Sequence, residues 1–308
     1  MDRAHLETRR FLIVTGKGGV GKTTVCAAEA LALAHKGKRV LIALCNAKER
    51  LSKMFGSDVV GSDVVPVAKN VWAVNMDPER ALEEYGEMVL RSRSLNALLF
   101  SNKYTRALFR GVPGMHEWAM LGKAWWHTTE VLPNGDDRFD VVILDAPATG
   151  HGLDMLRVPK VILDVVPPGL LRRDAERAWN LFRDEKTCAI VLVTLPEEMP
   201  TTETLELAHA LRDELKLPIA KLVVNCMIPP LFSPAERNAL TEAPAASPTT
   251  PGGAALAAAQ ARAVREKVQA ESLKRLTESL PLAPSFLPLL LCDAATRDAI
   301  VELSRRVA

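Results

Sequence analysis

The chain has 308 residues, 48% of them hydrophobic and 25% charged, with a formal net charge of +2. These values are typical of a soluble globular protein with a sizeable core, and the near-balanced charge gives no general attraction to nucleic acid or anionic membranes. No apolar run reaches the roughly 18 residues that a membrane helix needs, so we expect no integral membrane segment.

Short apolar runs alternate with helical patterns along the chain. The runs cover residues 11–16, 40–45, 71–76, 141–146, 189–195 and 220–227. The clearest helical patterns are 23–37 and 201–216, the second with Thr201 and Thr202 as N-cap candidates. These runs are near-continuously apolar instead of alternating, which is typical of strands in a sheet covered on both faces. The alternation predicts an α/β fold with a doubly wound, mostly parallel sheet.

Residues 16–23, GKGGVGKT, form a complete phosphate loop (P-loop) between the first apolar run and the first helical pattern. The glycines let backbone N–H groups converge on phosphate oxygens, and the following helix presents its positive end. We expect Lys22 to neutralise the β- and γ-phosphates and the Thr23 hydroxyl to bind Mg²⁺.

The same glycines also match the dinucleotide fingerprint G-x-G-x-x-G. That interpretation requires an acidic residue about 20 residues further on. The second apolar run ends instead at Asn46. The motif therefore favours ATP or ADP with Mg²⁺ over a dinucleotide.

The remaining site candidates follow from the fold. The run VVILD ends at Asp145, whose carboxylate suits the Mg²⁺ shell, and residues 146–151 form a turn beside the expected γ-phosphate. Lys17 occupies a P-loop position that needs no charge. It is either a solvated surface lysine or a lysine that reaches a nucleotide held by a facing subunit, like an arginine finger in trans. Its position alone leaves both open.

Several ordered motifs give the chain a family resemblance. GKGGVGKTT resembles the deviant Walker A of dimeric P-loop ATPases, and residues 141–159 are similar to switch II of the arsenical-pump and tail-anchored-protein targeting ATPase family. Further segments of that family resemble VPGMHEW (112–118), residues 193–204 and residues 221–230. The family's final adenine-side loop resembles FLPLL (286–290). The matches run from about residue 11 to 291.

The resemblance implies a nucleotide-gated dimeric ATPase that couples ATP binding and hydrolysis to a protein or membrane client. It implies that Lys17 contacts the partner's phosphates, Asp145 couples to Mg²⁺, Asn225 reads adenine and Glu197 lies near the nucleotide at the dimer face. The nucleotide would be cradled by Gly18, Gly19, Val20, Gly21, Lys22, Thr23 and Thr24.

Switch I departs from the family pattern. Alignment of LSKMFG (51–56) places Asn46 where the family has the aspartate that activates water, and Glu49 where it has a histidine. An amide can orient water but cannot take its proton. We therefore expect slow hydrolysis, with Glu49 as a candidate replacement or a plain helix-start carboxylate. The alternative is a weakly active or inactive scaffold subunit paired with a catalytic paralogue, so the dimer could be homomeric or heteromeric.

The cysteines set further expectations. Five are present, Cys26, Cys45, Cys188, Cys226 and Cys292, widely spaced and without C-x-x-C. With the charged segment 1–10, they predict reduced thiols in a cytoplasmic protein. The pump branch of the family resembles two fused halves with metalloid-binding cysteines in the helical region; because residues 78–187 hold no cysteine, we expect no arsenite binding. Because C-x-x-C is absent, we do not expect the zinc clamp of the eukaryotic targeting branch either.

The middle of the chain interrupts the strand–helix alternation. Residues 78–135 and 160–186 predict a helical subdomain inserted into a single P-loop ATPase domain that spans 1–308. Residues 243–253 predict a mobile loop before a long helix at about 254–279.

Trp118, Leu121 and Trp125 share one helical face. That stripe is either core or a groove for a client's apolar helix, and a membrane-lying helix is a third option. Upstream of the stripe lie five basic residues, which form a solvated outer face in the core interpretation: Arg91, Arg93, Lys103, Arg106 and Arg110.

A role in DNA partition shares the P-loop but lacks support in the switch II segment and around Asn225. We therefore expect no nucleic-acid partner.

Overall fold

An eight-stranded sheet forms the centre of the computed structural model, which describes residues 6–90, 114–148 and 150–307. The strand order is β3-β4-β2-β5-β1-β6-β7-β8, and every neighbouring pair is parallel except β3 and β4. The strands are β1 (Phe11–Thr15), β2 (Val40–Cys45), β3 (Val65–Ala68), β4 (Val71–Met76), β5 (Val141–Asp145), β6 (Cys188–Thr194), β7 (Ile219–Met227) and β8 (Pro284–Pro288). The predicted mostly parallel α/β fold is confirmed.

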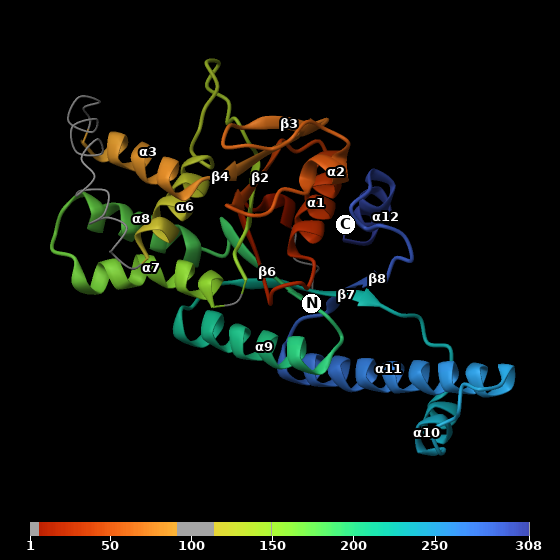
Figure 1. Cartoon of the computed structure of the whole chain (residues 1–308). Helices are drawn as coiled ribbons and strands as arrows, with labels where there is room; N and C mark the ends of the chain where they lie inside the picture. The colour runs from red at the N-terminus through yellow and green to blue at the C-terminus, as the bar shows by residue number, and fades with distance from the viewer. Residues whose placement is uncertain (1–5, 91–113, 149, 308) are drawn as a thin grey trace.

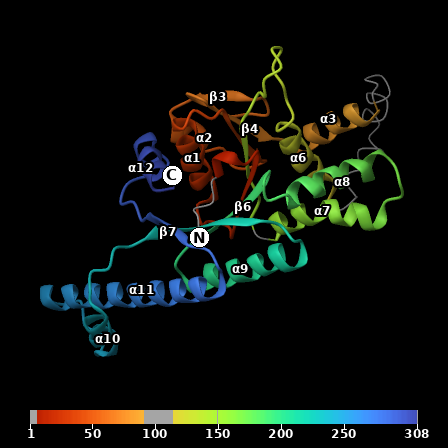
Figure 2. The ribbon, with the colours of Figure 1, turned by 180° about the vertical axis from the view of Figure 1, so that it is seen from behind.

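Helices cover both faces of this sheet, as Figures 1 and 2 show. On one face lie α1 (Lys22–His35), α2 (Leu51–Phe55) and α12 (Arg297–Val307). The other face carries α6 (Met115–Trp126), α7 (His151–Val165), α8 (Leu170–Arg183), α9 (Glu198–His209) and part of α11 (Pro251–Ser279). α3 (Pro78–Leu90) and a π-helical turn at Ala210–Glu214 add Ala81, Leu82 and Leu211 to the core on this second face. The 3-10 turn Leu6–Thr8 adds Leu6 to the core on the first face, and α10 (Pro234–Glu242) has no buried residue.

Alternating side chains of each central strand enter different halves of the core. In β1, Phe11 and Ile13 pack with the α6–α9 side, and the Phe11 ring stacks on Phe182 of α8 at 5.6 Å between centroids. Leu12 and Val14 pack with the α1 and α12 side. Burial on both faces explains why these strands are apolar at nearly every position instead of at every second one.

The helical patterns between residues 78 and 186 form α3, α6, α7 and α8, which contact one another in that order (Figure 1). Trp118 and Leu121 are buried, and Trp118 meets Tyr85 edge to face, so the core interpretation is confirmed for these two residues. Trp125 is partly buried against the same cluster. Residues 91–113, with the five bases named above, lie outside the described residues. Among the described helices, none has both the length and the apolar character needed to cross a bilayer.

Two strands and one helix start differ from the sequence-based prediction. β3 and β8 lie at the two edges of the sheet and contain prolines, which edge strands tolerate but which hide the strand pattern. β8 includes most of the segment expected to be an adenine-side loop. The predicted N-caps at Thr201 and Thr202 are wrong: α9 begins at Glu198, because Pro200 fits a first helical turn, where no N–H is needed.

The second half of the chain differs in smaller ways. The helix predicted over 201–216 changes to π-helical geometry after His209, where Leu215 N donates to the carbonyl of Ala210. The long helix predicted at about 254–279 begins three residues earlier. Pro251–Gly253, expected to belong to a loop, form its first turn because Thr250 caps it by accepting a bond from Gly253 N.

Candidate functional site: a P-loop at the carboxyl edge of the sheet

The candidate residues cluster where neighbouring parallel strands end. The P-loop, residues 16–23, follows β1, and its last two residues, Lys22 and Thr23, open α1. Asn46 follows β2, Asp145 ends β5, and Glu197 follows β6. Asp145 is in register with Val14 of β1 and with Leu44 of β2. Because parallel strands end at one edge, residues far apart in sequence meet in the crevice where such sheets bind ligands.

Two glycines allow the P-loop to pass close to its neighbours. Gly16 has φ +153°, and a Cβ there would lie 2.2 Å from the carbonyl oxygen of Val193. Gly21 has φ +92°, and its Cβ would lie 2.4 Å from Nδ2 of Asn225. Gly18 and Gly19 are exposed, and Val20 is buried beneath them. The loop therefore depends on glycine for its course as well as for access to its N–H groups.

The two lysines of the loop have different partners. Lys22 Nζ donates to the carbonyls of Gly16 and Lys17 at 3.2 and 3.1 Å, so its ammonium lies inside the loop. Burial lowers the Lys22 pKa, and the nearby Asp145 carboxylate opposes that shift. Lys17 Nζ instead forms an ion pair of 2.5 Å with Oε1 of Glu203 on α9.

A pair of oxygen ligands lies behind the loop. The Thr23 hydroxyl donates to Asp145 Oδ2 at 2.5 Å, while Asp145 Oδ1 is buried and has no hydrogen-bond partner among the described residues. Burial raises the pKa of Asp145, and the Thr23 hydroxyl, Lys22 and the Cys26 thiol act in the opposite direction. A buried carboxylate oxygen left open beside a hydroxyl is an arrangement that suits Mg²⁺, which prefers oxygen ligands. The residues present fit such an ion.

The switch I residues lie directly after β2. Asn46 is exposed and left-handed (φ +46°), and its N–H donates to the carbonyl of Met76. The Glu49 carboxylate accepts bonds from Ser52 N and Ser52 Oγ at 2.8 and 2.6 Å. Because this carboxylate caps the start of α2, its geometry favours the helix-start interpretation over a catalytic one.

Asn225 connects β7 to the P-loop. Its Nδ2 donates to the carbonyl of Val20 at 2.9 Å, and its Oδ1 accepts a bond from Cys226 N at 2.9 Å. Cys226 has φ +56° at an irregularity of the β7–β8 ladder. Glu197 is exposed at the N-cap of α9, close enough to help raise the pKa of Cys226 after the larger effect of burial. Thr24, half-buried, is the last of the predicted cradle residues.

Comparison with known proteins decides the family. The anion-transporting ATPase profile matches residues 9–167, just over half of the chain. The ATPase BagA of Mycobacterium tuberculosis is 30% identical over 243 residues, which cover 75% of this chain and 69% of BagA. The chain belongs to the anion-transporting ATPase family. The resemblance inferred from the sequence motifs is thereby confirmed.

Eukaryotic proteins are also similar to this anion-transporting ATPase chain. ATPase GET3B of Arabidopsis thaliana is 24% identical over 275 residues, 73% of this chain and 66% of GET3B. ATPase GET3 of Kluyveromyces lactis is 31% identical over 163 residues, which cover 50% of this chain and 46% of GET3.

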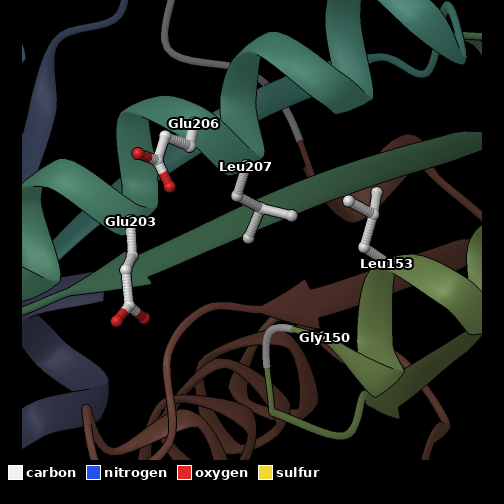
Figure 3. A pocket seen from close by; sticks show the side chains of 5 residues that line it. All are labelled: Gly150, Leu153, Glu203, Glu206 and Leu207. Atoms are coloured by element: carbon white, nitrogen blue, oxygen red, sulfur yellow. The ribbon is translucent and has the colours of Figure 1, made fainter.

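One residue beside the P-loop of this anion-transporting ATPase was missed by sequence reasoning. Glu203 lies 186 positions from Lys17 and nothing in its local pattern marks it as a partner of the P-loop. With Gly150, Leu153, Glu206 and Leu207 it lines a pocket of about 390 Å³ between α9 and the start of α7 (Figure 3). Its position on the helix face that points toward the P-loop is visible only once the fold is known.

Proposed function

We propose that this chain binds ATP with Mg²⁺ and hydrolyses it slowly. The observation that carries the proposal is the oxygen pair behind the P-loop, where Asp145 Oδ2 accepts the Thr23 hydroxyl and its buried Oδ1 stays open. Family membership supports the same activity.

Each residue of the P-loop has a task in this proposal. The Lys22 ammonium, now bound to loop carbonyls, exchanges them for phosphate oxygens, which is favourable for a partly desolvated cation. Thr23 and Asp145 would hold Mg²⁺, which would offset charge on the β- and γ-phosphates. Asn225 keeps the Val20 carbonyl turned inward, so that the loop N–H groups face the ligand.

We further propose that the ATPase works as a nucleotide-gated dimer that binds a protein or membrane client. Lys17 supports this, because it lies on the outer side of the loop with 26% of its side chain exposed and does not share the inward position of Lys22. A cation in that position can act on a triphosphate held by a second subunit, where transition-state charge must be stabilised.

One observation favours a second function, a scaffold subunit with little or no turnover. Asn46 replaces the expected carboxylate, and Glu49 is engaged by Ser52. Neither side chain is then a ready acceptor for the proton of an attacking water. In this case nucleotide binding would set the shape of a heterodimer and the paralogue would supply hydrolysis.

Phosphate release by the purified chain separates the two functions. We expect wild-type protein to exceed Lys22→Ala, and Asn46→Asp to exceed wild type by about tenfold or more, since a positioned base contributes at least that much. Glu49→Gln is the matched control and should leave the rate close to wild type. Equal rates for wild type and Lys22→Ala, with turnover only in Asn46→Asp, would reject the enzyme and favour the scaffold.

A further inference from the structure

The side chain of Lys17 is held within its own protomer. Its Nζ lies 2.5 Å from Oε1 of Glu203, and its carbonyl accepts a bond from Lys22 at 3.1 Å. The backbone and the side chain of this one residue are therefore restrained from different directions. The ion pair bridges two separate elements, the P-loop after β1 and helix α9.

The Lys17–Glu203 ion pair is partly exposed to solvent, so its two side chains can separate. The Lys17 and Glu203 side chains are 26% and 30% exposed, and Glu203 borders the pocket described above. In Figure 3, the Glu203 side chain extends away from α9, whereas the Glu206 side chain stays beside the helix. Water can replace either partner, so separation does not leave a charge stranded in the core, and the pair contributes only a modest free energy.

We propose that Glu203 is a positioning residue that retains Lys17 in the resting protomer and so restrains dimer closure. The proposal rests on the function above, in which Lys17 acts on the second subunit's nucleotide. One ammonium cannot serve Glu203 and that nucleotide at once, so the carboxylate competes with the partner's phosphates. A triphosphate carries more negative charge than a diphosphate and competes better. Glu203 adds the same cost to closure with either nucleotide, so closure requires the stronger attraction that the triphosphate provides.

The first test concerns the contact itself and does not need a dimer. Lys17 of the nucleotide-free protein is acylated with a small amine-reactive ester, and the rate is followed by mass spectrometry. Glu203→Gln should raise that rate roughly two- to fivefold, which is the range expected for a partly exposed ion pair. Glu206→Gln is the matched control, because it lines the same pocket on the same helix and, among the described residues, makes no ion pair with Lys17. Equal acylation in Glu203→Gln and wild type would overturn the proposal.

The second test concerns the restraint. The dimer dissociation constant is measured by sedimentation with Mg²⁺ and a slowly hydrolysed ATP analogue. Glu203→Gln should lower it by roughly two- to fivefold for each protomer, and the difference should shrink in 1 M salt. If wild type dimerises but Glu203→Gln has the same constant, the restraint is refuted while the proposed function stands. If acylation of Lys17 rises but no protein dimerises, the proposed dimeric function fails and with it the restraint.

Discussion

Replacing Gly21 by alanine tests how the P-loop is held against β7. Gly21 has φ +92°, where an alanine costs about 1–2 kcal/mol. The new Cβ would also lie 2.4 Å from Asn225 Nδ2, so the amide must move and give up its bond to the Val20 carbonyl. Losing that buried hydrogen bond costs about 1–3 kcal/mol more. We therefore expect Gly21→Ala to lower the free energy of unfolding by about 2–5 kcal/mol.

Gly19→Ala is the matched control. Gly19 has a similar φ of +85°, but its Cβ would meet nothing within 4 Å, so only the backbone cost of about 1–2 kcal/mol applies. Thermal unfolding without nucleotide should place the Tm of Gly21→Ala below that of Gly19→Ala by roughly 2–8 °C. Adding Asn225→Ala should destabilise Gly21→Ala much less than it destabilises wild type. Equal melting of the two glycine variants would refute the reasoning.

Three further outcomes test separate parts of the structure. Lys221→Met leaves the buried Glu29 carboxylate without its cation, so urea unfolding should show a loss of about 3–5 kcal/mol in the free energy of unfolding. Adding Glu29→Gln should largely restore it, and additive losses in the double variant would contradict this. Hydrogen bonds from Arg39 hold the pKa of Asp140 below its usual range, so this carboxylate stabilises the fold above its unfolded-state pKa and the contribution disappears as the pH falls through its folded-state pKa. Asp140→Asn should thus lower the Tm at pH 7 and approach wild type in acid; a pH-independent difference would count against it. Chelating Mg²⁺ should weaken nucleotide binding by wild type but hardly by Asp145→Asn, and equal sensitivity would remove Asp145 from the metal site.

The central strands were predictable because of where they lie. Runs such as 141–144 are apolar at every position since both faces of the sheet are covered, and the ends of these runs located Asp145 and Asn46 at one edge. The edge strands β3 and β8 were missed because an edge needs neither full burial nor a complete ladder and admits proline. The pattern of apolar residues in a strand reflects how much of the strand is covered, and edge strands are covered less than central ones.

The long-range contacts of the site could not be predicted in this way. Motif matching selected Lys17 and Asn225, but their partners, Glu203 and the Val20 carbonyl, are 186 and 205 positions away along the chain. Such pairs depend on the order of strands and on the rotation of α9 about its axis. The start of α9 at Glu198 shows how one proline can move a helix boundary.

The most direct test of the account is the mass of the chain in solution under different nucleotides. With Mg²⁺ and a transition-state mimic of ATP hydrolysis, wild type should have the mass of two chains, and with ADP mainly that of one. Lys17→Ala should keep nucleotide binding yet lose the two-chain species. A wild type that remains a single chain with every nucleotide, or a Lys17→Ala dimer as tight as wild type, would contradict the claim that each subunit completes its neighbour's site.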